Sequence, residues 1–517
     1  MTKQITPALV GLIVVAFLAA AQNPTPLVTK SRAELIATLQ SQASEKEKAD
    51  ACRELAVLGN KDAIPILVPL LSDEKLSHMA RYALEAMPDP AVNAALRGAL
   101  PHLQGRPLAG TISTLGVRRD REAAASIGGY LSNADPDVAQ AAARALGDIA
   151  SADAQKLLLA ALPMANAANE LAFCEGLFRC AENALRAGQV KRALAVYDAL
   201  RQHRTTLHQV RAGALRGAIV ARGQGGLDLL RASLVSQDYI LFAAAVRASQ
   251  EMPGAEVTQA LADSVQKLPP DNQIVVVQSL GQRGDAAALP TLIALAKNAP
   301  EGPRLASIRA LAEIGKAAAV PVLLDLQNAP ERVVAQAARE SLASIPGHDV
   351  DRLVMDKLAS AIAPDRLMAL DLIGRRRMES AVPALLGAAS DADAQVRVAA
   401  LKRLGELGKA AQFAPLLDLL FRATDADTRD GAEAGAIAIA ARTTPPQSLT
   451  GPVLDRLAAA PPAAKSALIR VLASIGGPSA LESVRQACKD PNAEVRAVAI
   501  RSLGSWKSLD AAPDLLT

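Results

Sequence analysis

The chain has 517 residues, of which 50% are hydrophobic and only 2% are aromatic. This length exceeds an ordinary single domain, so the chain must contain several cores or one continuous stack. Abundant Ala and Leu, with few runs of Val, Ile, Thr and Tyr, predict an all-α protein. The formal net charge of +4 is nearly neutral for this length and argues against nucleic acid as a partner.

The N-terminus has the pattern of a signal peptide. Lys3 precedes the apolar run 8–21, which ends in an A-x-A cleavage site. The run is shorter than the roughly 20 residues of a membrane-spanning helix, and no later segment is long enough. We therefore expect residues 1–21 to be removed and the mature chain, without a transmembrane segment, to be exported to the periplasm or the extracellular space.

Residues 22–43 are predicted to form a leader and a capping helix. Ser31 stands three residues before Glu34, and Ser44 stands three residues before Glu47. Each pair can form a capping box, in which the two side chains bind free amides at a helix start. We therefore expect helices to begin directly after both serines.

A hexad of the form x-Leu-Gly/Ala-x-apolar-Gly/Pro then recurs, as in "ELAVLG" and "RLGELG". Its second position is occupied by Leu55, Leu84, Leu115, Leu146, Leu185, Leu215, Val246, Leu280, Leu311, Leu342, Leu372, Leu404, Ile437, Leu472 and Leu503. The first and last of these are 448 residues apart, a mean of 32 over 14 intervals. A fixed period of this size indicates a repeat array of about 15 units.

A second marker, Pro-x-Leu, keeps register with the hexad. It occurs at Pro65, Pro290, Pro321, Pro383, Pro415 and Pro513, 10 or 11 residues after the hexad position of the same unit. Proline is tolerated in the first turn of a helix, where its missing N–H would have had no partner. Each clear unit is therefore predicted to be a helix, a tight turn and a second helix.

These units resemble HEAT-like repeats of the bilin-lyase type, over residues 44–165 and 236–517. Asp391 precedes Arg397 by six residues and Asp490 precedes Arg496 by six, which matches the inter-repeat ladder of HEAT proteins. The resemblance implies a superhelical α-solenoid. It also implies that the Pro-x-Leu helices line the inner wall of a groove, and that Arg397 pairs with Asp391 or with a neighbouring unit.

Residues 166–235 depart from the regular period. The stretch "CAENALRAGQVKRALAVYDAL" resembles a tetratricopeptide unit, with Gly188, Ala193 and Tyr197 at that family's spacing. An irregular HEAT unit is the alternative. Either interpretation keeps a helix pair at this place in the stack.

The same region is the most basic part of the chain. From Arg186 to Arg231 there are nine Lys or Arg and two Asp, a net charge of +7. An acidic protein partner or another anionic ligand could bind there, and a solvated outer face is the alternative. The candidate residues are Arg201, Arg204, Arg211, Arg216 and Arg222. The shorter cluster "GRRRM", residues 374–378, is interpreted as solvated.

The sequence contains no recognisable catalytic, cofactor-binding or metal-binding motif. None of the five histidines is followed by Glu, so the His-Glu pairs with which a HEAT-repeat hydroxylase family binds iron are absent. P-loop, Rossmann, G-x-S-x-G and H-E-x-x-H patterns are absent too. Four cysteines remain, and Cys174 and Cys180 on one predicted helix are too far apart for a disulfide, so buried thiols are expected.

Two functions remain open. The first is a non-enzymatic, exported scaffold that binds a protein partner along the solenoid groove. The second is the accessory arm of a larger exported enzyme whose catalytic domain lies beyond residue 517, because "AAPDLLT" begins a second helix and stops after one turn. A bilin-lyase-like activity is disfavoured, because that reaction is intracellular and this chain carries an export signal.

Overall fold

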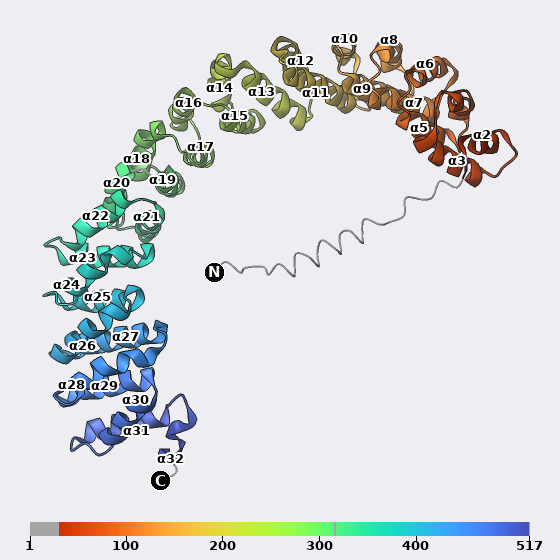
Figure 1. Cartoon of the computed structure of the whole chain (residues 1–517). Coiled ribbons are helices and arrows are strands. Elements are labelled where there is room, and N and C mark those ends of the chain that lie inside the picture. The colour runs from red at the N-terminus through yellow and green to blue at the C-terminus, as the bar shows by residue number, and fades with distance from the viewer. Residues whose placement is uncertain (1–29, 315–316, 516–517) are drawn as a thin grey trace. The chain divides into compact units, whose positions relative to one another are not determined.

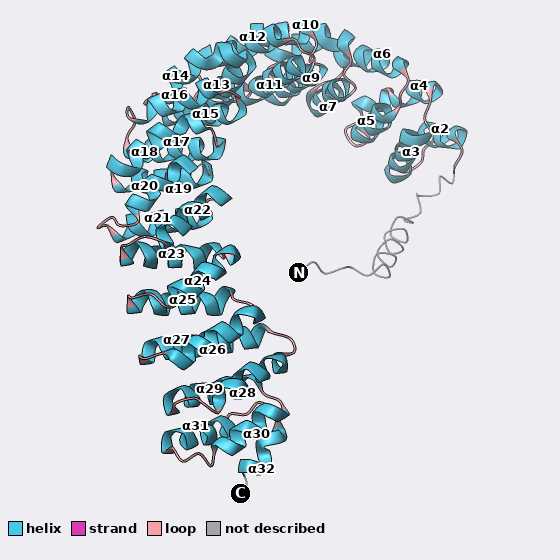
Figure 2. Ribbon diagram, turned by 60° about the vertical axis from the view of Figure 1, so that its left-hand side comes forward, coloured by secondary structure: helices cyan, strands magenta, loops and turns pink. Residues whose placement is uncertain are grey.

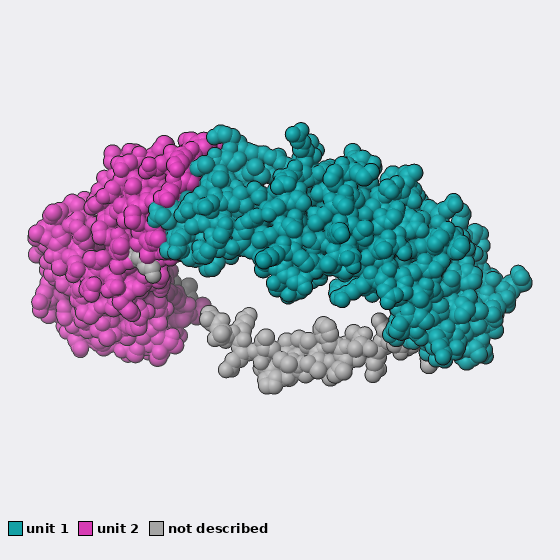
Figure 3. Space-filling view, turned by 90° about the horizontal axis from the view of Figure 1, so that it is seen from above, with its two compact units in different colours: residues 1–260 teal, residues 261–517 magenta. Residues whose placement is uncertain are grey.

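A computed structural model describes residues 30–314 and 317–515, and every regular element in these ranges is a helix (Figure 2). The predicted signal peptide, and the leader up to residue 29, lie outside the described residues. The chain divides into two compact units, residues 1–260 and 261–517 (Figure 3). Each unit is a stack of helix pairs, so the predicted all-α solenoid is confirmed.

Unit 1 begins with α2 (Arg32–Gln40), which packs on the first regular helix pair (Figure 1). Both predicted capping boxes are formed, at Ser31 with Glu34 and at Ser44 with Glu47. The first helices of the pairs are α3 (Glu45–Leu58), α5 (Ser77–Ala86), α7 (Gly105–Val117), α9 (Pro136–Ile149), α11 (Glu170–Arg186), α13 (His208–Arg222) and α15 (Tyr239–Glu251). The second helices are α4 (Ile64–Leu67), α6 (Pro90–Ala99), α8 (Ala124–Gly128), α10 (Ala152–Ala161), α12 (Val190–Gln202), α14 (Leu227–Leu234) and α16 (Ala255–Val265), which contains the unit boundary.

Unit 2 continues the same pattern. Its first helices are α17 (Pro270–Arg283), α19 (Glu301–Ile314), α21 (Arg332–Ser344), α23 (Ala363–Arg376), α25 (Ala394–Leu407), α27 (Ala426–Arg442), α29 (Pro462–Ile475) and α31 (Ala493–Gly504). Its second helices are α18 (Leu289–Asn298), α20 (Val320–Leu326), α22 (His348–Leu358), α24 (Val382–Ala388), α26 (Phe413–Arg422), α28 (Thr450–Leu457), α30 (Pro478–Ala487) and α32 (Ala512–Leu515).

The hexad positions account for the core. Each of the fifteen first helices in the described residues, α3 to α31, contains one predicted position, and all but Leu185 and Ile437 are buried. In α27 the register was misassigned: Ile439 is buried, and it lies three residues before Arg442, as Leu115 lies three residues before Arg118. Both arginines bind carbonyls of the preceding unit, so Ile439 is the equivalent position.

The Pro-x-Leu markers begin second helices, as predicted. Five of the six prolines occupy the second position of their helices, and Pro415 occupies the third position of α26. A 3-10 turn precedes each of these helices, for example Ala286–Ala288 before α18 and Ala317–Ala319 before α20. The N–H groups of the first helical turn have no partner within the helix, so a proline there costs no hydrogen bond and is tolerated.

Small residues bring neighbouring first helices close together. A Cβ added at Gly147 in α9 would lie 2.5 Å from the Cα of Gly176 in α11, and one at Gly405 in α25 would lie 2.9 Å from the Cα of Gly435 in α27. Ordinary carbon contacts are about 3.5 to 4 Å, so only glycine permits this approach. The first helices are therefore the tightly spaced layer of each stack.

Tight spacing of one layer makes a stack curve toward that layer. In unit 1, α5, α7, α9 and α11 lie on the inner side of the curve, and α6, α8, α10 and α12 lie on its outer side (Figure 1). The expectation that the Pro-x-Leu helices line the inner wall is therefore wrong for unit 1. The first helices, which carry the hexads, occupy that side.

The irregular stretch forms a helix pair with an unusually long second helix. α11 has 17 residues and α12 has 13, and the turn between them contains Gly188 with φ of +70°. Tyr197 is buried, with its ring centroid 6.3 Å from that of Phe178, and its ring fills the space beside Gly217. The stack therefore continues through this region, as expected.

Candidate functional site

The first helices leave one face uncovered in each stack. α9 packs against α7 and α11 on its two sides and against α8 and α10 behind it. Between Val138 and Ile149, only Gln140, Arg144 and Asp148 are partly exposed, and the other residues are buried. A spacing of four residues places these three side chains on one side of the helix. We call this side, formed by the exposed stripes of the first helices, the open face of each unit.

Exposed apolar side chains concentrate on the first helices. Of the thirteen large hydrophobic side chains that are exposed in the described residues, eight belong to first helices. Unit 1 contributes Val57, Tyr82, Val117, Leu171 and Tyr239, and unit 2 contributes Val333, Val398 and Ile500. Tyr82 is 56% exposed and Leu171 is 40% exposed. Single exposed apolar side chains are ordinary on a protein surface, so the notable feature is their recurrence on one layer, where they can serve as anchors for a protein partner.

Ion pairs also join neighbouring first helices. Arg144 Nε lies 2.9 Å from Glu175 Oε2, and Arg179 Nη1 lies 2.6 Å from Asp148 Oδ1, so α9 and α11 are joined in both directions. All four side chains are more than a third exposed, and such pairs contribute about 0 to 1 kcal/mol. The pairs orient the helices more than they stabilise them, and they give the open face fixed charges of both signs.

The basic segment is largely paired. Arg216 binds both carboxylate oxygens of Glu251 at 2.6 and 2.5 Å, and Arg211 binds Asp238. The Arg211 hydrogen bond lowers the pKa of Asp238 below its usual value. These carboxylates belong to α15 and its N-cap, outside the segment whose charge was counted. The net charge of the segment did not include these two carboxylates, because only residues between Arg186 and Arg231 were counted.

Two further candidate arginines share one carboxylate. Arg222 Nη2 lies 2.6 Å from Asp198 Oδ2, and Arg201 Nη1 lies 3.2 Å from Asp198 Oδ1. Arg204 is exposed, and no described residue forms an ion pair or hydrogen bond with its side chain. Of the five candidate residues, Arg204 is therefore the one whose charge is not already engaged.

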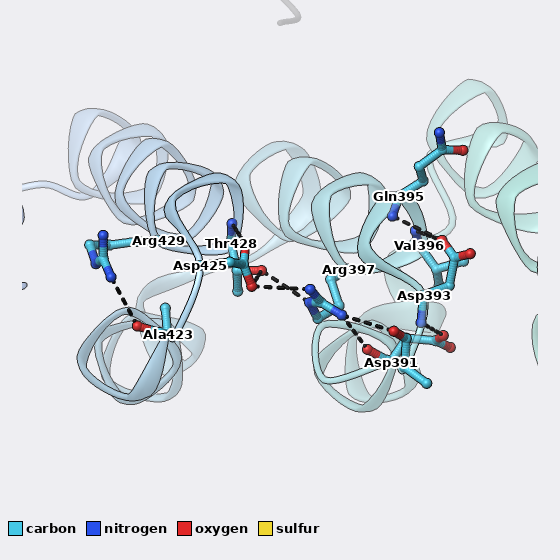
Figure 4. Close-up of polar contacts among 10 residues, drawn as sticks. Asp391, Asp393, Gln395, Val396, Arg397, Ala423, Asp425, Thr428 and Arg429 are labelled. Atoms are coloured by element: carbon cyan, nitrogen blue, oxygen red, sulfur yellow. Dashed lines mark hydrogen bonds and ion pairs between the residues drawn. The ribbon is translucent and has the colours of Figure 1, made fainter.

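The predicted ladder has a different geometry from a simple pair within one unit (Figure 4). The Nη1 atom of Arg397 donates to the backbone carbonyls of Asp391 and Ala392 at 2.9 and 3.1 Å. Its Nη2 donates to the Asp425 carboxylate of the next unit at 3.0 Å, and its Nε donates to Thr428 Oγ1, also at 3.0 Å. Arg397 therefore joins its own turn to the start of α27.

The other ladder carboxylates are held by the unit before them. Asp391 accepts from Arg366 at 2.8 Å, and Asp490 accepts from Lys465 at 2.6 Å. The Lys465 hydrogen bond lowers the pKa of Asp490. Arg496 donates to the backbone carbonyls of Asp490 and Pro491 at 2.7 and 2.8 Å. Each carboxylate thus connects two successive units, a structural role that gives these residues no free ligand-binding group.

A second arginine contact was not predicted. Arg118 Nη1 donates to carbonyls at the end of α5, including those of Leu84 at 3.1 Å and Met87 at 2.5 Å. Arg376 makes the equivalent contacts with the end of α21 at the same separations of 34 and 31 residues, and Arg442 contacts the end of α25. The last carbonyls of a helix lack partners within it, and these arginines supply them. Arg376, in "GRRRM", is therefore buried and bonded, and the interpretation as solvated is wrong for it.

All four cysteines are free thiols; Cys52, Cys174 and Cys180 are buried, as expected, whereas Cys488 is only half-buried. Burial raises the pKa of Cys52 to about 11 and those of Cys174 and Cys180 to about 12. Such thiols are poor nucleophiles and poor metal ligands at neutral pH. Within residues 30–314 and 317–515, no group of three or more His, Cys, Asp or Glu side chains is arranged to hold a metal ion. Nor does any helix there have the length and apolar character needed to cross a bilayer.

Comparison with protein families finds HEAT repeats in unit 2. The family model for HEAT repeats matches residues 265–343, 354–436 and 451–517. No curated protein sequence matches the chain. The bilin-lyase type of repeat is a finer distinction that the match does not address.

Several solved structures are similar to this chain. They include Kap95p, a yeast importin-β, with 14% identity over 92% of this chain and 77% of its own and a TM-score of 0.43. Another importin-β structure has 12% identity over 98% and 84%, with a TM-score of 0.41. Human deoxyhypusine hydroxylase has 18% identity over 61% and 95%, with a TM-score of 0.22. The chain's own helix pairs and the family match together identify it as an all-α solenoid whose second unit contains HEAT repeats.

Proposed function

We propose that this protein is a non-enzymatic scaffold that binds a protein partner through the open face of its first helices. The observation that carries the proposal is the gathering of exposed apolar side chains on that layer, among them Val57, Tyr82 and Leu171. Apolar and aromatic anchors surrounded by fixed charges are the usual composition of a protein interface. HEAT solenoids typically serve as protein-interaction scaffolds, which supports the same function.

The proposal includes export. The signal-peptide pattern of residues 1–21 supports removal of that segment and a periplasmic or extracellular location. N-terminal sequencing of the mature protein from the exported fraction is expected to begin at Gln22. Recovery of the whole protein in the cytosol with Met1 or Thr2 at its N-terminus would overturn this part of the proposal.

A pair of matched variants tests the open face. Tyr82→Glu with Leu171→Glu places two charges on it, and Met164→Glu with Val190→Glu places two charges on exposed apolar sites outside the first helices. Leu171 and Val190 are both 40% exposed, so the comparison controls for exposure. Interface anchors typically contribute about 2 kcal/mol or more each, which corresponds to at least a tenfold loss in affinity.

The measurement is quantitative mass spectrometry of proteins captured from the exported fraction by each variant. We expect the first pair to lose at least about tenfold of the specific partner and the second pair to retain it. Equal recovery by both pairs, or loss confined to the second pair, would refute the open face as the binding surface. Circular dichroism should show that both variants melt as the unmodified protein does.

The basic segment supports a narrower second candidate. Arg204 has no partner in the described part of the chain, so it is available to an acidic group of a bound protein. Arg204→Gln tests this, with Arg201→Gln as the paired comparison, because Arg201 is already engaged by Asp198. A partner that contacts the segment should dissociate faster from the Arg204 variant at low salt, and unchanged dissociation would remove the segment from the interface.

A further inference from the structure

A polar cavity lies in unit 1 at the turns of three successive repeats. Its volume is about 360 Å³, within the range of ligand-binding cavities, and its wall includes Arg119, Arg121 and Arg192. The residues come from the turn after α7, and from the turns between α9 and α10 and between α11 and α12 together with the adjoining helix ends. Of the partly exposed stripe on α9, only Asp148 also borders the cavity; Gln140 and Arg144 do not.

Two of the three arginines have no side-chain partner in the part of the chain that the structure describes. Arg119 and Arg121 are exposed, and no described residue forms an ion pair or a side-chain hydrogen bond with either. Their sequence neighbours Asp120 and Glu122 are acidic, but both bind Arg97. The carboxylates nearest in sequence are therefore engaged elsewhere, and both guanidiniums keep their full charge and their hydrogen-bond donors.

The third arginine is held in place by neutral groups. Arg192 donates to the side-chain oxygen of Gln155 at 3.1 Å, to that of Gln189 at 2.5 Å and to the carbonyl of Ala150 at 3.4 Å. None of these partners carries a charge, so the positive charge of Arg192 is oriented and not neutralised. With its Nε bond to Gln155, these contacts use every N–H of Arg192 except one on Nη1, which remains for an anion that the fixed charge attracts without further ordering.

The rest of the wall does not cancel this charge. The wall contains one carboxylate, Asp148, and Arg179 from outside the cavity binds it at 2.6 Å. Ser151 and Ala152, at the start of the ten-residue helix α10, also border the cavity. The Ser151 side chain caps the helix by accepting from the Ala154 amide at 3.1 Å, and the other amides of the first turn lack helical partners and favour an anion. Asp153 in the first turn is exposed and is not part of the wall.

We propose that this cavity binds a phosphoryl group, either free phosphate or the phosphate of a small phosphorylated molecule. Three guanidiniums and the start of a helix match a doubly charged anion with several acceptor oxygens better than they match a single carboxylate. The cavity is a small-molecule site and is independent of the protein partner proposed for the open face. No protein is needed to occupy it.

Titration calorimetry of the full mature chain at constant ionic strength tests this site. The ligands are inorganic phosphate and glycerol 3-phosphate, with chloride as the background anion. We expect saturable binding of at least one of them at a single site. Tighter binding of inorganic phosphate identifies the free ion as the ligand, and tighter binding of glycerol 3-phosphate identifies a phosphorylated molecule.

Variants locate the binding. Arg119→Gln and Arg121→Gln should each weaken it about tenfold or more, because each removes charge-assisted hydrogen bonds. Lys156→Gln on α10 removes the same charge from an exposed side chain outside the cavity wall and should leave binding unchanged. The side chains of Arg119 and Arg121 bond to no residue within 30–314 and 317–515, so the variants should melt at the temperature of the unmodified protein. Absence of saturable binding, or equal affinities in all three variants, would overturn the proposal.

Discussion

The close approach of α9 and α11 gives a quantitative prediction for a single methyl group. Gly147→Ala places a Cβ 2.5 Å from the Cα of Gly176 and 2.8 Å from its carbonyl oxygen. Both neighbours are backbone atoms of a helix, so a whole helix has to move. Overpacking of this kind costs roughly 1 to 3 kcal/mol, and the gain in helix propensity is about 1 kcal/mol. The difference is a net destabilisation of about 0 to 2 kcal/mol, and the contact of 2.5 Å with backbone places the expectation in the upper half of that range.

A matched glycine separates the two effects. Gly98 lies within α6, and a Cβ added there would meet nothing within 4 Å. Gly98→Ala should therefore stabilise the protein by about 1 kcal/mol through propensity alone. Urea unfolding followed by circular dichroism compares the two variants with the unmodified chain. If Gly147→Ala stabilised the protein as much as Gly98→Ala does, the close packing of the first helices, and with it the explanation of the curvature, would be refuted.

Three other predictions concern the ladder and the thiols. Arg397→Gln should lower the free energy of unfolding by about 2 kcal/mol, because the charged hydrogen bonds of Arg397 are lost. Lys402→Gln is the control: Lys402 is exposed on the same helix, and its replacement should change the free energy of unfolding little in the same urea experiment. Asp490 has a lower pKa in the folded chain than its value of about 4 in the unfolded chain, so its carboxylate stabilises the fold above that pH. This stabilisation is lost as the pH falls through the folded-state pKa. In an acid titration, an Asp490→Asn variant should not show this loss of stability. With Ellman's reagent, the half-buried Cys488 should react in the native protein and the three buried cysteines only after unfolding, and rapid reaction of all four would contradict the core.

The regular part of the fold could be predicted from local patterns. Leu55 and Leu404 are buried because the hexad places them on the core side of a helix, and Pro290 starts a helix because its missing amide costs nothing there. These signals act within one unit. The predicted inner wall is the wrong layer in unit 1, where Gly147 indicates that the first helices approach each other closely.

Contacts between units could not be read in the same way. Arg376 binds carbonyls 34 and 31 residues earlier, and the sequence shows no sign of where the helix that carries them ends. Arg216 has no acidic partner within its own segment, and Glu251, 35 residues further along, neutralises it. Arginines without such partners among the described residues, such as Arg119 and Arg204, can be identified only after the ion pairs and hydrogen bonds between units are known.

Photo-crosslinking in living cells tests the proposed function most directly. A photoreactive phenylalanine analogue replaces Tyr82 or Leu171 on the open face of unit 1, and Val190 on α12 serves as the control. Irradiation should produce a discrete crosslinked protein from the first two positions and none from the third. Crosslinks of equal yield from all three positions, or from Val190 alone, would contradict a scaffold that binds its partner through the first helices.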